Sequence, residues 1–242
     1  MTGSPEAKAD ASAATASRRK LRALAVHGGY SNSNIMKFQL AQVRKALGKD
    51  VEWLLPDASV PQHPYAEVPE ANIFPDISDF EARLAQGKPL VSWYVLRVSG
   101  DRVITDPDTW EVASEALIGF IDREEPIDLA VGFSQGALMI TRIALRFKRE
   151  GRPVPWQLAV FFCPSDPTVE LKPSEFVEHL SFPVLHITSP PDPHYSLSMQ
   201  SYAQVFPDSL RTVLLHEDGY AFPMTAPRAA EIYRQIAEDI RK

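Results

Sequence analysis

The sequence predicts an α/β protein in which a mostly parallel central sheet is flanked by helices on both faces. Short apolar runs alternate with helical periodicity from Leu21 onward, which is typical of parallel strands joined by crossover helices. The chain has 242 residues, of which 45% are hydrophobic and 23% charged, enough to bury one large core. The pentapeptide Gly132-Phe133-Ser134-Gln135-Gly136 lies between an apolar run and an alanine-rich helical pattern, as a strand, a sharp turn and a helix would.

Each element follows from a local pattern. Apolar runs predict strands at residues 21–26, 51–55, 91–98, 127–133, 158–162, 184–188 and 212–215. Helical stripes are formed by Met36, Leu40, Val43 and Leu47; by Ala113, Ala116, Leu117, Phe120 and Ile121; by Tyr195, Met199, Tyr202 and Phe206; and by Ala229, Ile232, Tyr233, Ile236 and Ile240. We expect one α/β domain over residues 21–242.

Two segments do not fit the alternation. Residues 1–20 are rich in Ala and Ser without an apolar stretch, so we expect a disordered tail and no secretory signal. Residues 56–89 are rich in proline and too polar to form core, so we expect them to shape the mouth of a site. Trp93 is open to two interpretations, as a strand residue or as the wall of a pocket.

Composition excludes several classes of protein. The net charge of −6 and the pI near 5.5 argue against a protein that binds nucleic acid, because such proteins carry a basic surface. No segment has the roughly 20 apolar residues that a membrane span requires. Cys163 is the single cysteine, which excludes an internal disulfide framework, and we expect it to be a buried structural thiol. These features fit a reducing, cytoplasmic location, and no Cys/His pattern has metal-site spacing.

Ser134 is the candidate nucleophile. Glycines on both sides let the backbone turn tightly, which lifts the Ser134 hydroxyl above the edge of the sheet. The helix behind it points its N-terminal N–H groups at a developing oxyanion. The alternative is a serine that merely caps a buried helix.

Asp192 is the candidate orienting acid. It lies in the loop after the strand expected at residues 184–188. In a catalytic triad whose members occur along the chain in the order Ser, Asp, His, the carboxylate lies in a loop of this kind. Its alternative interpretation is an aspartate in a turn between two prolines. The loop after the last strand, residues 216–223, should supply the base, and its histidine is His216, at the strand end.

The chain resembles the fungal-type serine hydrolases of the FSH family, which include the ovarian-cancer-associated hydrolase-like proteins. The resemblance runs from about Leu21 to the C-terminus and rests on residues 24–28, 131–137, 183–187 with Asp192, and 219–223. It implies the α/β-hydrolase fold and the hydrolysis of carboxylic esters or thioesters, with Ser134 as nucleophile and Asp192 as acid.

One position departs from the family. The resemblance implies a catalytic histidine in a segment that reads roughly H-x-G-G-H-x-x-P. Aligned on Gly219 and Pro223, this chain has Tyr220 at that position and Asp218 at the first glycine, while His216 matches the leading histidine. A phenol with an ordinary pKa of about 10 is almost wholly protonated at pH 7, so a tyrosine cannot accept the serine proton as imidazole does.

Three explanations stay open at this point. Another histidine could replace the base: His216 lies four residues upstream, out of reach without a loop rearrangement, and His194 lies only two residues after Asp192. The protein could instead be catalytically impaired and bind a small ligand or a protein. Tyr220 could also support chemistry other than simple hydrolysis.

The oxyanion hole should come from two backbone N–H groups. Gln135 would supply one, and Gly29 or Tyr30, in the loop that His27 opens, would supply the other. We expect no metal and no organic cofactor. The expected partner is a small-molecule acyl ester or thioester, and the sequence identifies neither the acyl group nor the oligomeric state.

Overall fold

A parallel six-stranded sheet forms the centre of the protein in a computed structural model, which describes residues 19–64, 78–99, 102–165 and 179–241. The expected tail at residues 1–20 lies almost entirely outside these ranges. The strands are β1 (Leu21–Val26), β2 (Val51–Leu54), β5 (Leu129–Phe133), β6 (Leu158–Phe162), β7 (Val184–Thr188) and β8 (Arg211–Leu215). Their order is β2-β1-β5-β6-β7-β8, so β5, which leads into Ser134, is an inner strand.

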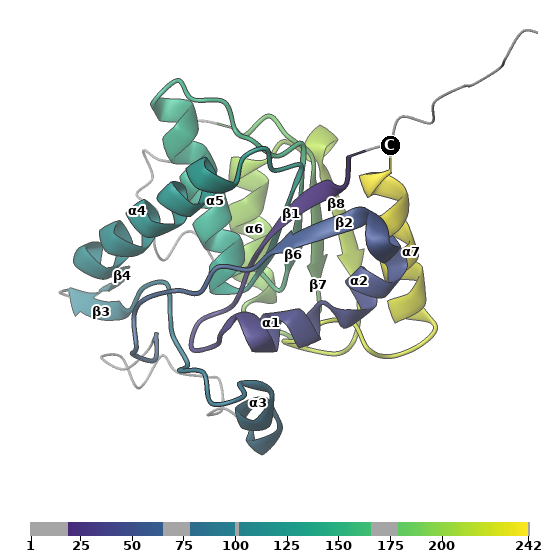
Figure 1. The fold of residues 1–242 in the computed structure, drawn as a ribbon, viewed down its shortest axis with the longest axis horizontal. Coiled ribbons are helices and arrows are strands. Elements are labelled where there is room, and N and C mark those ends of the chain that lie inside the picture. The colour runs from purple at the N-terminus through teal and green to yellow at the C-terminus, as the bar shows by residue number, and fades with distance from the viewer. Residues whose placement is uncertain (1–18, 65–77, 100–101, 166–178, 242) are drawn as a thin grey trace, which may run out of the picture.

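Helices cover both faces of this sheet, as the sequence predicts (Figure 1). One layer holds α4 (Pro107–Glu124), α5 (Gln135–Arg149) and α6 (Tyr195–Val205). The other layer holds α1 (Ser33–Gln39), α2 (Ala41–Leu47) and α7 (Arg228–Ile240). The stripe of Met36, Leu40, Val43 and Leu47 is buried, although a break at Leu40 divides it between two helices.

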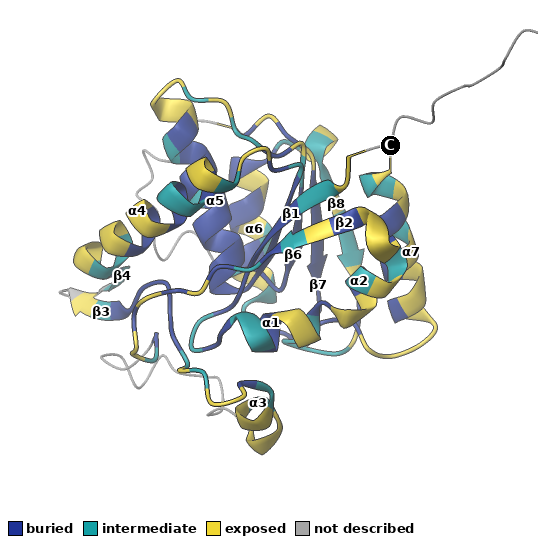
Figure 2. Ribbon diagram, in the orientation of Figure 1, coloured by how far each residue is buried: buried dark blue, intermediate teal, exposed yellow. Residues whose placement is uncertain are grey.

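The core lies in two layers, one on each face of the sheet. The inner strands β5 and β7 are buried along their whole length, and α5 is buried along most of its face (Figure 2). Parallel strands covered on both faces are continuous apolar runs, which is why 127–133 and 158–162 could be recognised in the sequence. Cys163 is buried directly after β6, as expected.

The segment between β2 and α4 differs from the expectation. Residues 91–98 do not form one strand: an isolated bridge pairs Val91 with Ser31, and β3 begins only at residue 96. The strands β3 (Leu96–Ser99) and β4 (Arg102–Thr105) make a separate antiparallel hairpin. Within the proline-rich stretch, α3 (Asp79–Leu84) begins at Ser78 with a capping box completed by Glu81, and residues 65–77 lie outside the described ranges.

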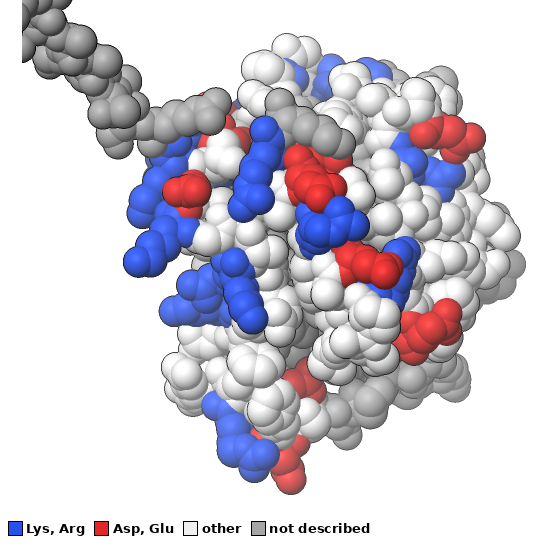
Figure 3. Space-filling view, turned by 90° about the vertical axis from the view of Figure 1, so that its right-hand side faces the viewer, with Lys and Arg blue, Asp and Glu red and all other residues white. Residues whose placement is uncertain are grey.

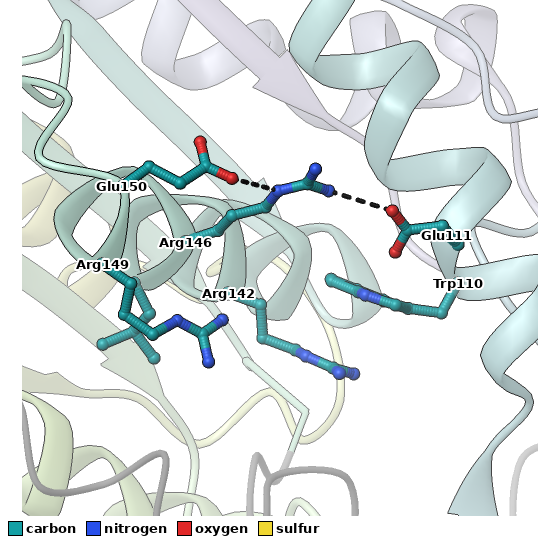
Figure 4. Close-up of a pocket in the computed structure, with 7 residues that line it drawn as sticks. Trp110, Glu111, Arg142, Arg146, Arg149 and Glu150 are labelled. Carbon is teal, nitrogen blue, oxygen red and sulfur yellow. Dashed lines mark hydrogen bonds and ion pairs between the residues drawn. The ribbon is translucent and has the colours of Figure 1, made fainter.

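An ion-pair network joins α4 to α5. Arg146 on α5 forms ion pairs with Glu111 on α4 and with Glu150 (Figure 4). A third ion pair joins Arg146 to Glu115 on α4. Beside it, the Arg142 guanidinium stacks 3.6 Å from the centre of the Trp110 ring. The cavity between these side chains, about 290 Å³, therefore has charged walls held by the packing of the two helices.

The surface has no dominant basic patch on the face that Figure 3 shows, where acidic and basic side chains both occur among many uncharged ones. Among the described residues, no helix is both long enough and apolar enough to pass through a membrane.

Two buried histidines predict acid sensitivity. Burial lowers the pKa of His27 to about 4 and that of His186 to about 3. Because the unfolded chain has histidine pKa values near 6.5, it binds more protons below that pH than the folded protein does. We expect the free energy of unfolding to have its full value above pH 6.5 and to decrease as the pH is lowered toward 4.

Urea denaturation at pH 7, 5.5 and 4.5 measures this loss. The variant His186→Leu should show a smaller decrease between pH 7 and pH 4.5, since one of the buried histidines whose pKa is lowered no longer titrates. The matched variant His179→Leu changes an exposed histidine and should keep the wild-type decrease. Equal decreases in both variants would contradict the assignment.

Candidate active site

Ser134 lies on a strained turn between β5 and α5. Its backbone has φ 51° and ψ −120°, a region that residues with a side chain rarely adopt. The Ser134 N–H donates to the Phe162 carbonyl at 3.0 Å, which fixes the turn against β6. Ser134 is thus held in a sharp strand-to-helix turn at the carboxyl end of an inner strand.

The two glycines of the motif are required by close backbone contacts. A Cβ built on Gly132 would lie 2.5 Å from the Ala137 Cα. A Cβ on Gly136 would lie 2.5 Å from the His27 carbonyl oxygen and still closer to that of Val26. The first contact holds α5 against β5, and the second holds α5 against the end of β1, so neither can be relieved without separating α5 from a strand.

We expect Gly136→Ala to destabilise the protein strongly. The new methyl group would push α5 away from β1, and overpacking of this kind costs about 1 to 3 kcal/mol or more. Thermal unfolding measures the loss. Gly151→Ala is a control for substitution of glycine itself: no atom lies within 4 Å of its built Cβ, although its positive φ of 69° adds some strain. A Gly136→Ala variant as stable as wild type would contradict the close contact.

Tyr220 contacts Ser134 directly. Its hydroxyl donates a hydrogen bond to the Ser134 Oγ, and the Ser165 Oγ lies 3.3 Å from the same atom. The Tyr220 ring packs against Phe133, with the ring centres 5.1 Å apart. The residue that the resemblance aligns with a catalytic histidine is therefore also a residue that contacts Ser134.

The loop that carries Tyr220 is fixed on both sides. The Cys163 thiol donates toward the carbonyls of Gly219 and Ala221, at 3.6 and 3.4 Å, which bracket Tyr220 in the sequence. The Asp218 carboxylate accepts the Met224 N–H at 2.9 Å, and hydrogen bonds within this loop hold the pKa of Asp218 below its usual value. These contacts keep the phenol in place over the nucleophile.

Asp192 is buried, and its carboxylate accepts the His194 N–H at 2.9 Å. Burial raises its pKa, while this hydrogen bond, the charge of His194, the Cys163 thiol and His216 act in the opposite direction. Asp192 is thus connected to the Tyr220 loop through Cys163, whose own pKa is raised by burial and by the nearby carboxylate.

His216 is buried next to acidic groups. Its Nδ1 accepts the Asp218 N–H at 3.2 Å, so in the neutral ring the proton is on Nε2. That Nε2 is buried and has no hydrogen-bond partner among the described residues. Burial lowers the pKa of His216, against the attraction of Asp218 and Asp192. The hydrogen bonds found at Ser134 involve Tyr220 and Ser165 rather than this ring.

The loop after β1 faces the start of α5. The Tyr30 N–H donates to the Ser92 Oγ at 3.0 Å, whereas the structure has no hydrogen bond from the Gly29 N–H within the described residues. The side chain of Gln135 accepts the Trp93 N–H at 2.9 Å and donates to the Tyr94 carbonyl at 2.8 Å. These bonds attach the segment at 93–94 to the helix that follows Ser134.

Two contributors were not found from the sequence. Ser165 lies three residues after β6, at the edge of the sheet that also carries Ser134, and that position was the available signal. The contacts by which Cys163 holds the Tyr220 loop could not be predicted from the sequence, because a cysteine in an apolar run is typical of a core residue. In the described ranges, no three His, Cys, Asp or Glu side chains are grouped so that they could hold a metal ion.

The chain is similar to named esterases and to solved hydrolases. It is 27% identical over 233 residues to Esterase FPY3 of Fusarium mangiferae, covering 91% of this chain and 96% of that protein. Esterase FUS5 of Gibberella moniliformis is 25% identical over 222 residues, covering 90% and 85%. The structure of acyl-protein thioesterase 2 of Zea mays matches with a TM-score of 0.57 at 18% identity, covering 92% and 94% of the two chains.

A carboxylesterase from Mesorhizobium loti matches with a TM-score of 0.56 at 14% identity, covering 90% of this chain and 88% of the other. At these identities the solved structures establish the α/β-hydrolase fold. The family model described as serine hydrolase (FSH1) matches residues 16–232, which is most of the sequence. The chain therefore belongs to the FSH1 serine hydrolase family.

Proposed function

We propose that this serine hydrolase cleaves small carboxylic esters or thioesters through an acyl intermediate on Ser134. The observation that supports the proposal most directly is the strained backbone of Ser134, which presents its hydroxyl beside Tyr220 at the end of an inner strand. Similarity to proteins named esterases supports the same class of substrate.

In the proposed acylation step, Tyr220 takes the place of the histidine. The phenolate form of Tyr220 accepts the proton of the Ser134 hydroxyl while the Oγ forms a bond to the acyl carbon. The N–H groups of Gln135 and Gly29 receive the negative charge of the oxyanion. As the bond to the leaving group breaks, the Tyr220 phenol returns the proton to the departing alcohol or thiol.

In the second step, water attacks the acyl carbon and Tyr220 accepts a proton from it. The bond to Ser134 breaks, the Oγ recovers a proton, and a carboxylic acid leaves. Because only a small fraction of an ordinary phenol is ionised at pH 7, the reaction should be slow there and faster at alkaline pH. No step requires a metal or an organic cofactor.

We assign Asp192 to a positioning role. Its carboxylate lies beside the Cys163 thiol, which contacts the carbonyls on both sides of Tyr220. His216 lies near Asp192 and is the base in the alternative in which the loop rearranges, with His194 as the other candidate. The single buried cysteine supports a reducing location, and we place the protein in the cytoplasm.

A fluorophosphonate probe tests the proposed nucleophile. We expect the wild-type protein to be labelled, faster at pH 9 than at pH 7, and we expect mass spectrometry to place the label on the peptide that contains Ser134. The variant Ser134→Ala should not be labelled. A folded protein that stays unlabelled at both pH values would instead support the alternative, a catalytically impaired relative that binds a small ligand or a protein.

A further inference from the structure

A second cavity of about 290 Å³ lies between α4 and the loop that follows β2. None of Ser134, Tyr220 and Asp192 lines it, so it is separate from the catalytic groups described above. Its walls come from residues 56–59, from Trp93 and from one face of α4. The cavity is large enough for a small molecule of roughly ten heavy atoms, given that pockets for drug-sized ligands begin near 300 Å³.

The inner part of this cavity is apolar. Trp93 and Leu117 are each 1% exposed and form its base, and Phe120 lies partly exposed beside them. Ala113 and Ala116 also line it, and their small side chains leave the space open along α4. An alkyl chain placed here would remove apolar surface from water at both partners.

The rim of the cavity carries one cation that has no acidic partner. Arg123 on α4 lines the cavity and forms no ion pair within the described residues, and its guanidinium lies close to Gly119, one turn back along the helix. The acidic residue at the rim, Asp57, is already paired with Lys88 and accepts the Ser33 N–H at 2.7 Å. The charge at the rim that a ligand can pair with is therefore the positive charge of Arg123, and a ligand carboxylate would pair with it.

The wall of the cavity is connected to the oxyanion region. The Trp93 Nε1 donates to the His27 carbonyl at 2.9 Å, and the Trp93 backbone N–H donates to the Gln135 side chain at 2.9 Å. The Ala58 N–H, from the opposite wall, donates to the His27 Nε2 at 3.1 Å. A ligand in this cavity would thus contact residues that hold the loop after β1 and the residue next to Ser134.

We infer that this cavity binds an aliphatic carboxylate of medium chain length, with the chain against Trp93 and Leu117 and the carboxylate paired with Arg123. Binding itself does not depend on the proposed function. The source of the ligand does, because hydrolysis of an aliphatic ester or thioester would release a molecule of this kind.

Isothermal titration with sodium octanoate tests the site in the Ser134→Ala variant, so that turnover plays no part. We expect saturable binding of one octanoate per chain. Adding Arg123→Gln should weaken it about three- to fivefold, as expected for a partly exposed ion pair. Adding Ala116→Phe should fill the cavity and abolish measurable binding, and 1-octanol should bind the parent more weakly than octanoate.

Matched controls come from α3, where Ala82 and Arg83 are also exposed helix residues. Ala82→Phe and Arg83→Gln should leave the affinity for octanoate unchanged. Binding that survives both Ala116→Phe and Arg123→Gln would overturn the site. In the wild-type protein, protection of Ser134 from the fluorophosphonate by octanoate that persists in Ala116→Phe would place the ligand in the catalytic site and would also overturn the inference.

Discussion

Replacing Ser134 by alanine should lower kcat for p-nitrophenyl acetate by about 10⁴- to 10⁶-fold, leaving only the residual catalysis that the oxyanion hole and substrate binding supply. The reason is that the acyl intermediate cannot form without the Oγ that Tyr220 and Ser165 contact. Stopped assays at pH 9, where the wild-type rate should be higher, give the widest range for this measurement.

Ser165→Ala is the matched control for loss of a hydroxyl at the site. Its Oγ lies 3.3 Å from the nucleophile, which is a weak hydrogen bond, so kcat should fall by less than about tenfold. If Ser165→Ala lost as much activity as Ser134→Ala, the assignment of Ser134 as the only nucleophile would be wrong.

Replacing Tyr220 by histidine should raise kcat/KM at pH 7 by about 10- to 100-fold. An ordinary phenol is about one part in 10³ ionised at this pH, whereas most of an imidazole is neutral, and the greater basicity of phenolate offsets only part of that difference. The pH dependence should change as well: the wild-type rate should rise toward the ordinary phenol pKa of about 10, and the variant should level off above about pH 7.

Tyr220→Phe separates the hydroxyl from the ring. It keeps the packing against Phe133 but removes the hydroxyl that is hydrogen-bonded to Ser134, so activity should be lost at every pH. If Tyr220→His is folded and its activity is unchanged or lower, or if Tyr220→Phe stays active, then the base is a histidine such as His194 or His216 and the loop must rearrange to bring it in.

The sheet could be predicted from the sequence because its inner strands are buried on both faces. β6 and β7 were expected at the residues where they occur, since each is a short, mostly apolar run. The prediction of one strand at 91–98 was wrong for a related reason. This segment is apolar because it is buried, and a buried apolar run need not be a strand. Trp93 is in fact buried as the wall of a cavity, the alternative that the sequence left open.

Helix faces could be predicted where the buried residues are apolar and less well where they are polar. On α6, Ser198 and Ser201 face the core while Met199 is only half-buried, so the apolar stripe expected there was wrong in part. His186 is a polar residue in the middle of β7. It is fully buried, but neither ring nitrogen has a hydrogen-bond partner among the described residues.

The site was predictable in its positions but not in its contacts. The motif around Ser134 and the departure at Tyr220 are both visible in the sequence, because each lies at a fixed place after a strand. Which of Tyr220, His194 and His216 lies against the serine depends on how the loop after β8 folds back. That path is set by hydrogen bonds that the Cys163 thiol donates and the Asp218 carboxylate accepts, and no periodicity encodes them.

Because Cys163 is buried, the reactivity of its thiol reports the opening of the structure around it. It is the single sulfhydryl of the chain, it is 1% exposed, and it lies under the loop that carries Tyr220. A thiol reagent such as Ellman's can react with it only when that loop separates from β6. The reaction rate therefore reads out how often the catalytic loop detaches, in an unlabelled protein and without any engineered probe.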